Sequence, residues 1–238
     1  MKATMACVLF SIIFLQGCRP APSEFPVRWT KYVELKSLDE IDAQMDKRLE
    51  PFGFQDGLRL GYDSDGVTVH TVREYLAGRE KGYETMYGGA VKLEGVFKRA
   101  AVPAKYLKNA VPARVSYVHD LKLSRRPLDL PATIGPGQHH EISPHVKEMM
   151  AKGKTWREIW PEMTWTIEDD YAIWLEDESG WDFITLLAWG DFNHDGFEDV
   201  LVNINDIPRP GQGTYRYYGY VVLTRRSPGG KMEILSQD

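Results

Sequence analysis

The sequence predicts an α+β protein with a mixed N-terminal part that holds several helices and a C-terminal antiparallel sheet. Helix-start signals occur before Trp160 and become rare after it. From Met163 onward, β-branched and aromatic runs of strand length follow one another, and turns such as Ser227-Pro228-Gly229-Gly230 separate them. Because no helix signal lies between these runs, we expect neighbouring strands to pair as an antiparallel meander.

Capping signals place the helices. In a capping box, a Ser or Thr hydroxyl and the carboxylate of a Glu three residues later satisfy backbone amides at the start of a helix. Three such boxes and one Ser-Pro start predict helices at 38–49, 72–79 and 144–152 and a short one from 156. Gly153 is the expected end of the third of these helices.

Strands are predicted where three to eight residues are rich in β-branched or aromatic side chains and are bounded by turn residues. These runs lie at 59–62, 68–70, 90–97, 163–167, 172–175, 183–188, 200–204, 217–224 and 232–235. The segment between the runs at 183–188 and 200–204 carries the clearest chemical signal of the chain.

That segment reads Asp191-Phe192-Asn193-His194-Asp195-Gly196-Phe197-Glu198-Asp199. Calcium takes six to eight oxygen ligands from a backbone that turns sharply, and here oxygen-bearing side chains fall at loop positions one, three, five and nine. The spacing predicts a Ca²⁺ site made of the side chains of Asp191, Asn193, Asp195 and Asp199 and the backbone carbonyl of Phe197. Gly196 permits the turn. The alternative is a plain turn, because Asp, Asn and Gly suit turns without a metal.

The first six residues of this loop match an EF-hand, but Val202 stands where the EF-hand has its twelfth-position Glu. Gly190 to Val202 instead resembles the integrin-type calcium loop of FG-GAP and VCBS repeats. Those families repeat the motif around a propeller, whereas this chain carries it once. The resemblance therefore implies a structural calcium ion between two strands and no propeller.

The N-terminus predicts export and lipidation. Met5 to Leu15 is an apolar run of signal-peptide length that is too short to span a bilayer. It ends in Leu15-Gln16-Gly17-Cys18, which resembles the lipobox of bacterial lipoproteins and implies fatty acyl chains such as palmitate on Cys18. The other cysteine, Cys7, lies within the segment to be removed, so no disulfide is expected. By the same resemblance, Arg19 implies sorting to the outer membrane, facing the periplasm.

We therefore expect a signal peptide at 1–17, a proline-containing tether at 18–26 and an α+β domain at 27–238, with subdomains at 27–154 and 155–238 as the alternative. The formal charge is −5, so nothing global favours nucleic acid as a partner. The whole layout resembles bacterial lipoproteins whose activity is not assigned. This resemblance supplies a location and no reaction.

The leading hypothesis is a non-catalytic, lipid-anchored envelope protein with a structural calcium ion, which binds an unknown protein or saccharide partner. No catalytic residue and no organic cofactor are predicted. One alternative is a saccharide hydrolase, because six Trp lie between Trp156 and Trp189 among carboxylates of 168–199. Another is contact with anionic lipid or a polyanion through the basic segment Lys98 to Arg126. His139, His140 and His145 lack a zinc-site spacing and read as a loop.

Overall fold

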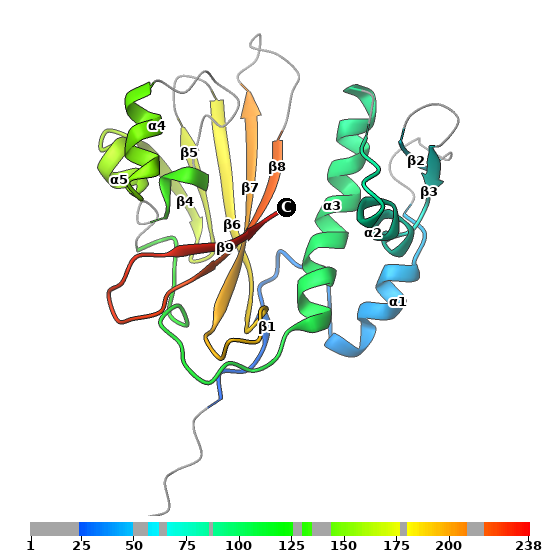
Figure 1. Cartoon of the computed structure of the whole chain (residues 1–238), viewed down its shortest axis with the longest axis horizontal. Helices are drawn as coiled ribbons and strands as arrows, with labels where there is room; N and C mark the ends of the chain where they lie inside the picture. The colour runs from blue at the N-terminus through cyan, green and yellow to red at the C-terminus, as the bar shows by residue number, and fades with distance from the viewer. Residues whose placement is uncertain are drawn as a thin grey trace, which may run out of the picture.

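The computed structural model describes residues 24–49, 57–61, 66–85, 88–125, 130–134, 144–176, 180–208 and 217–238. It confirms the α+β class: a seven-stranded antiparallel sheet fills the C-terminal part, and the helices lie on either side of it (Figure 1). The predicted signal peptide, Cys18 and His139 to Glu141 lie outside the described residues. None of the described helices is both long enough and apolar enough to cross a bilayer.

The main sheet is a meander, as predicted. Its strands follow in chain order: β4 (Thr164–Asp169), β5 (Ala172–Glu176), β6 (Gly180–Gly190), β7 (Asp199–Pro208), β8 (Tyr217–Thr224) and β9 (Glu233–Gln237). One short strand from the N-terminal part, β1 (Arg28–Trp29), pairs with the end of β6, where Arg28 lies opposite Trp189. The sequence analysis did not foresee β1.

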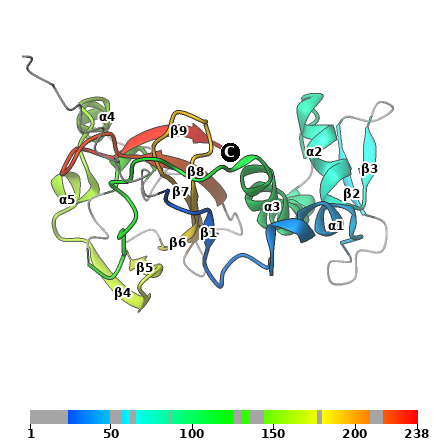
Figure 2. The same cartoon turned by 90° about the horizontal axis from the view of Figure 1, so that it is seen from below.

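One face of the sheet packs against an N-terminal layer. This layer consists of η1 (Leu38–Glu40), α1 (Ile41–Asp46), α2 (Val72–Glu80), α3 (Gly88–Asn109) and the hairpin of β2 (Leu58–Leu60) and β3 (Val67–Val69). The long helix α3 lies between the sheet and the rest of the layer (Figures 1 and 2). Its buried Phe97 and Leu107 share one core cluster with Leu201 and Tyr220 of the sheet.

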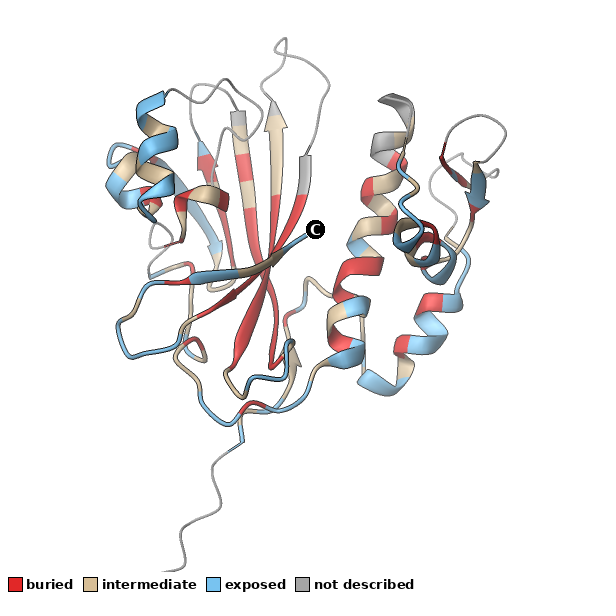
Figure 3. Cartoon of the chain, in the orientation of Figure 1, coloured by how far each residue is buried: buried red, intermediate tan, exposed pale blue. Residues whose placement is uncertain are grey.

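The opposite face packs against Val118, Leu123 and Leu130 of the coil after α3 and against η4 (Ala132–Ile134), α4 (Pro144–Ala151) and α5 (Trp156–Ile159). Trp156 is fully buried there with Ile184 and Val202. The buried residues therefore concentrate in the central strands and in the facing side of α3 (Figure 3). This packing makes β6 and β7 the best-anchored strands, and they carry the predicted calcium loop between them.

The predicted strand at 90–97 is wrong, because these residues belong to α3. Val91, Leu93 and Phe97 alternate with Lys92, Glu94 and Lys98, which is the pattern of a half-buried strand. Leu93, Phe97 and Ala101 are equally spaced four residues apart, and all three are buried on one face of the helix. The helix continues to Asn109 and includes Pro103, so the helical period decides the structure.

The other helices follow their capping signals to different extents. At α2 the Thr71 hydroxyl accepts from the Glu74 amide, and the Glu74 carboxylate accepts from the Thr71 amide, as predicted. Ser37 makes no such bond, and the predicted helix at 38–49 is a 3-10 turn followed by α1, which ends at Asp46. The strand and helix ends otherwise lie within a few residues of the predicted ones, except that β6 and β7 extend further.

Candidate metal centre

The loop 191–199 connects β6 to β7 and rests against the coil that follows α3. Asp191 forms an antiparallel bridge with Val111, and Phe197 forms a parallel bridge with Val115. The amides of Arg114 and Val115 donate to the Gly196 carbonyl at 2.9 and 3.0 Å. The loop is therefore held along its length by backbone hydrogen bonds to a segment eighty residues earlier in the chain.

Backbone amides orient the predicted ligands. The Asp191 carboxylate accepts from the amides of Asp195 at 3.1 Å and Gly196 at 2.8 Å, so the chain folds around the first ligand. The Asn193 and Asp195 side chains each accept from the amide two residues on, at 3.1 and 2.9 Å. Gly196 has a φ of 90°, which a residue with a side chain rarely adopts. These bonds use only part of each side chain's capacity to accept hydrogen bonds. Lone pairs on its oxygens remain available for a cation.

Asp199 is the unusual member of the set. Its side chain is fully buried, and its Oδ2 accepts from the Phe192 amide at 2.9 Å, but its Oδ1 has no hydrogen-bond partner. The Thr224 hydroxyl lies beside the carboxylate without hydrogen-bond geometry. Burial raises the pKa of Asp199 to about 6, and the charges of Asp195 and Asp191 raise it further in the same direction. An ionised carboxylate at this position needs a positive partner.

A protein cation already touches the outer side of the loop. Arg226, just after β8, places its Nη2 2.9 Å from Asp195 Oδ2, and Asn193 Nδ2 lies 3.0 Å from the same oxygen. The guanidinium also pairs with Glu233 and lies 5.5 Å from the centre of the Phe197 ring. Asp195 is therefore paired with Arg226.

The donor set fits calcium in its chemistry, because carboxylate, amide and carbonyl oxygens are the ligands this hard cation takes. The orphaned, fully buried Oδ1 of Asp199 is the atom that most needs such a cation. Within the described parts of the chain, no three His, Cys, Asp or Glu side chains are arranged so that they could hold a metal ion as they stand. A complete site therefore requires Asn193, the Phe197 carbonyl and a rotation of Asp195 away from Arg226.

Glu198 lies on the other side of the loop and forms a second polar cluster that the sequence analysis missed. Its fully buried carboxylate accepts from the Ser116 hydroxyl at 2.5 Å and lies 3.2 Å from His119 Nδ1. Arg28 of β1 approaches to 3.9 Å and stacks on the Trp189 ring at 4.3 Å. The signal in the sequence was weak: Glu198 sits at an even loop position between ligand positions, and its partners lie about 80 or more residues away.

The Trp-rich and acidic segment does not converge on one reaction centre in the described structure. Trp165, Trp174 and Trp181 line a hollow of about 410 Å³ together with Thr164, Thr166 and a single carboxylate, Glu176. Two other acids of this segment are engaged elsewhere: Asp169 pairs with Lys31 at 2.8 Å, and Asp170 pairs with Lys122 and Ser124. Trp156 and Trp189 are core residues.

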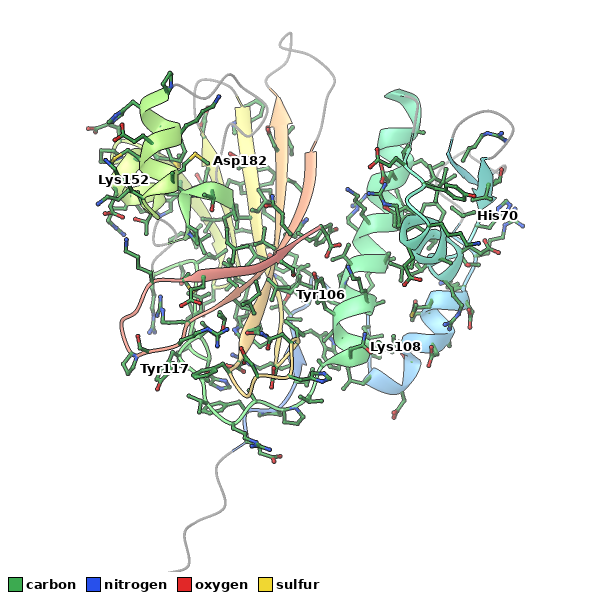
Figure 4. The ribbon with its side chains drawn as sticks, in the orientation of Figure 1. His70, Tyr106, Lys108, Tyr117, Lys152 and Asp182 are labelled. Atoms are coloured by element: carbon green, nitrogen blue, oxygen red, sulfur yellow. The ribbon has the colours of Figure 1, made fainter. Side chains whose placement is uncertain are left out.

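Part of the basic segment Lys98 to Arg126 pairs with acids of the same chain. Lys105 pairs with Asp238 at 2.8 Å, and Lys108 pairs with Asp42 at 2.7 Å. Figure 4 shows Tyr106 and Lys108 on α3, with Lys108 on the side of α1. These pairs tie α3 to the C-terminus and to α1, so part of the segment's positive charge is already balanced within the fold.

His194 occupies a position between ligands in the loop and has a φ of 63°. Its side chain is exposed, and Nε2 lies 2.7 Å from the Asn109 carbonyl at the end of α3.

Comparisons with protein-family models, with curated proteins and with solved structures found no match to this chain.

Proposed function

We propose that this protein is a lipid-anchored protein of the bacterial cell envelope, in which one structural calcium ion joins β6 to β7, and that it binds a partner or ligand without catalysing a reaction. The observation that carries the calcium is the Asp199 carboxylate, which is fully buried and has one oxygen without a partner beside Asp191 and Asp195. A cation there would satisfy that oxygen and offset the cost of burying its charge.

The anchor is proposed from Cys18 and the lipobox-like residues before it. The described chain begins beside the loop: Phe25 and Ala113 exchange backbone hydrogen bonds of 2.8 and 2.9 Å, and Arg114 contacts Gly196. Cys18 and Phe25 are seven residue steps apart, and each step spans at most ~3.6 Å, so the anchor lies within roughly 25 Å of Phe25 at this end of the sheet. A lipid on Cys18 would place the calcium loop at the end of the protein that is nearer the membrane. In the proposed location, the protein is anchored in the outer membrane and lies on its periplasmic side.

A calcium experiment tests the first part. For a dissociation constant on the order of 0.1 mM, calcium at about 1 mM adds ~1.4 kcal/mol of stability. For a chain of this size that corresponds to a rise in melting temperature of roughly 3–6 °C. We expect this rise for the wild type in 1 mM calcium relative to EDTA, no rise for Asp195→Asn, and an unchanged rise for the exposed control Asp39→Asn. Identical melting of the wild type in calcium and in EDTA would contradict the proposed calcium site.

Labelling with palmitate tests the anchor. Radiolabelled palmitate should enter the wild-type chain and not a Cys18→Ala variant, because Cys18 is the predicted acylation site. Entry into both chains, or into neither, would refute lipidation at Cys18. Fractionation of the labelled cells should place the wild type with the outer membrane.

A saccharide is the second candidate ligand, and the hollow on β4, β5 and β6 favours it. Trp174 packs on Phe183 at 4.4 Å between ring centres, and Trp174 and Thr166 are cross-strand neighbours on one face. Aromatic faces beside hydroxyl and carboxylate groups suit a sugar ring, which is apolar on its faces and polar at its edge. Hydrolysis needs two carboxylates that flank one bond, and Glu176 is the one described carboxylate of this hollow. We therefore propose binding, not hydrolysis, for this hollow.

Titration with chitohexaose and maltohexaose, followed by Trp fluorescence, tests the saccharide candidate. Binding that is lost in Trp174→Ala and kept in the control Trp29→Phe, whose side chain lies on β1, would support it. Absence of binding to either hexasaccharide, or equal loss in both variants, would remove these sugars as ligands of the hollow.

A further inference from the structure

A second hollow lies on the coil that follows α3. It measures about 400 Å³, which is within the range of small-molecule sites. Its walls come from the coil at 116–125, from Leu130, and from the connection between β8 and β9. Tyr117, one of the lining residues, lies beside that connection in Figure 4. The hollow therefore joins segments that are about 100 residues apart in the sequence.

The charged side chains of this hollow are mostly positive. Lys122, Arg125 and Arg225 line it, against one acid, Asp120. The chain as a whole carries a formal charge of −5, so this concentration of positive charge is local and opposes the general trend. Lys122 is partly balanced by Asp170, which lies outside the lining. The charge of Arg125 also acts on Asp170, so Arg225 supplies most of the remaining positive charge.

Arg225 has unused hydrogen-bonding capacity in this wall. Its Nη1 makes a long contact of 3.4 Å with the Tyr117 carbonyl, and its Nε is buried without any hydrogen-bond partner. A buried donor without a partner is uncommon and destabilises the free protein. A guanidinium presents its donors as a planar fork that matches a carboxylate or a phosphate, and Arg225 lines the hollow, so its Nη groups could hold an anion there.

The rest of the lining is mixed: Ser116 and His119 are polar, and Tyr117, Leu121, Leu130 and Met232 are apolar or aromatic. Leu130 and Met232 are buried, whereas Tyr117 and Leu121 are partly exposed. An anionic group on an apolar body would cover these partly exposed surfaces, which an inorganic ion would leave in water. The size, the charge and the apolar wall thus agree on one class of ligand.

We propose that this hollow binds a small organic anion, with its carboxylate or phosphate held by Arg225 and Arg125 and its apolar part packed on Leu121 and the Tyr117 ring. The inference deepens the proposed binding function by naming a ligand class, and it does not rest on the calcium loop. It also gives a role to Arg125 and Lys122. Both belong to the basic segment Lys98 to Arg126, for which contact with a polyanion or anionic lipid was an alternative. The same chemistry could come from a soluble metabolite or from a phospholipid headgroup.

Calorimetric titration of the full-length protein in neutral detergent and 150 mM NaCl tests the proposal. The probes are phenyl phosphate, benzoate and, as an uncharged match, benzyl alcohol. At least one of the two anions should bind and benzyl alcohol should not. Arg225→Gln should weaken anion binding about tenfold or more, as expected for the loss of a charged bidentate contact. Arg125→Gln should weaken it less, and Arg114→Gln, an exposed arginine of the same segment outside the hollow, should change it less than twofold.

Additional measurements distinguish a soluble anion from a lipid headgroup and separate failure of this proposal from failure of the calcium site. Binding to phosphatidylglycerol vesicles that Arg225→Gln weakens, with no binding of the soluble probes, assigns the site to a lipid headgroup and supports the same chemistry. Repeating the titration in EDTA separates this proposal from the calcium site, because anion binding should persist there. If Arg225→Gln fails to fold, as judged by its melting curve, Arg125→Gln carries the comparison. Binding of neither anion nor vesicle, equal binding by all variants, or an equal loss in Arg114→Gln overturns the proposal.

Discussion

Replacing Asp199 by Asn should stabilise the protein in the absence of calcium and abolish its response to calcium. The folded structure raises the pKa of Asp199 from its usual 3.8 to about 6, chiefly because the side chain is buried. Each pKa unit corresponds to about 1.4 kcal/mol, so ionised Asp199 destabilises the metal-free fold by about 3 kcal/mol at pH 8. Asn keeps an acceptor for the Phe192 amide, and its NH₂ group faces the unpartnered Thr224 hydroxyl.

The direction of the pH dependence follows from the raised pKa. Stability contributed by protonated Asp199 is fully present below pH ~4, the pKa in the unfolded chain, and is lost as the pH rises through about 6. The advantage of Asp199→Asn over the wild type in EDTA should therefore be about 3 kcal/mol at pH 8 and roughly half of that at pH 5. For a chain of this size the larger value corresponds to a rise of roughly 6–12 °C in melting temperature.

Thermal melting followed by circular dichroism gives the four values needed, for the wild type and the variant in EDTA and in 1 mM calcium at each pH. In calcium the wild type should gain stability and the variant should not, because Asn removes the charge of the ligand at loop position nine. Asp39→Asn, an exposed acid, is the matched control and should melt like the wild type. A variant that melts below the wild type in EDTA at pH 8 would refute the argument from buried charge.

Three further results are expected. Arg226→Gln should tighten calcium binding about tenfold at low salt, measured against a chelator, since it removes a positive charge 2.9 Å from Asp195. The control Lys36→Gln should leave the calcium affinity unchanged. Equal calcium affinities of the wild type and Arg226→Gln would show that Arg226 does not compete with the ion. Trp156→Ala should destabilise the protein by about 3–5 kcal/mol in urea unfolding because the fully buried ring leaves a cavity, and a loss below 1 kcal/mol would contradict its core position. Gly196→Ala should lower stability by about 1–2 kcal/mol through its φ of 90° alone, since open space surrounds the added methyl group; unchanged melting would show that the loop relaxes.

The sheet was predictable because its signals are local. Tyr217 to Thr224 was predicted with the ends that the structure shows, and the Thr71 capping box fixed the start of α2. By contrast, Val91 to Lys98 satisfies the period of a strand and that of a helix, and the choice depends on what the segment packs against. β1 is two residues long and has no local signal, because its pairing with Trp189 and Ala188 creates it.

In the loop, too, some features follow from the local sequence and others depend on distant residues. The positions of Asp191, Asn193, Asp195 and Asp199 follow from spacing, and the structure places all four in one turn between β6 and β7. The groups that set the loop's electrostatics come from elsewhere: Arg226 follows β8, and the partners of Glu198 lie on β1 and the coil after α3. Contacts across such separations depend on the assembled fold, so a single sequence does not reveal them.

Charge balance on the two sides of the loop argues for a divalent cation on one side. Glu198 is enclosed by a hydroxyl, a histidine and Arg28, so that side of the loop is satisfied by the protein itself. The opposite side holds Asp191, Asp195 and Asp199, and the one described cation that pairs there, Arg226, reaches Asp195 from the outside. Three carboxylates with one outlying arginine leave a deficit of about two positive charges when all are ionised, which is the charge of one calcium ion.

Without the ion, Asp199 keeps its proton up to about pH 6, because burial raises its pKa. Calcium and the proton are thus alternative ways of neutralising the same buried carboxylate, so calcium binding to the wild type should release close to one proton at pH 5 and far less at pH 8. A calcium titration that releases no more protons at pH 5 than at pH 8 would separate the two and remove Asp199 from the ligand set.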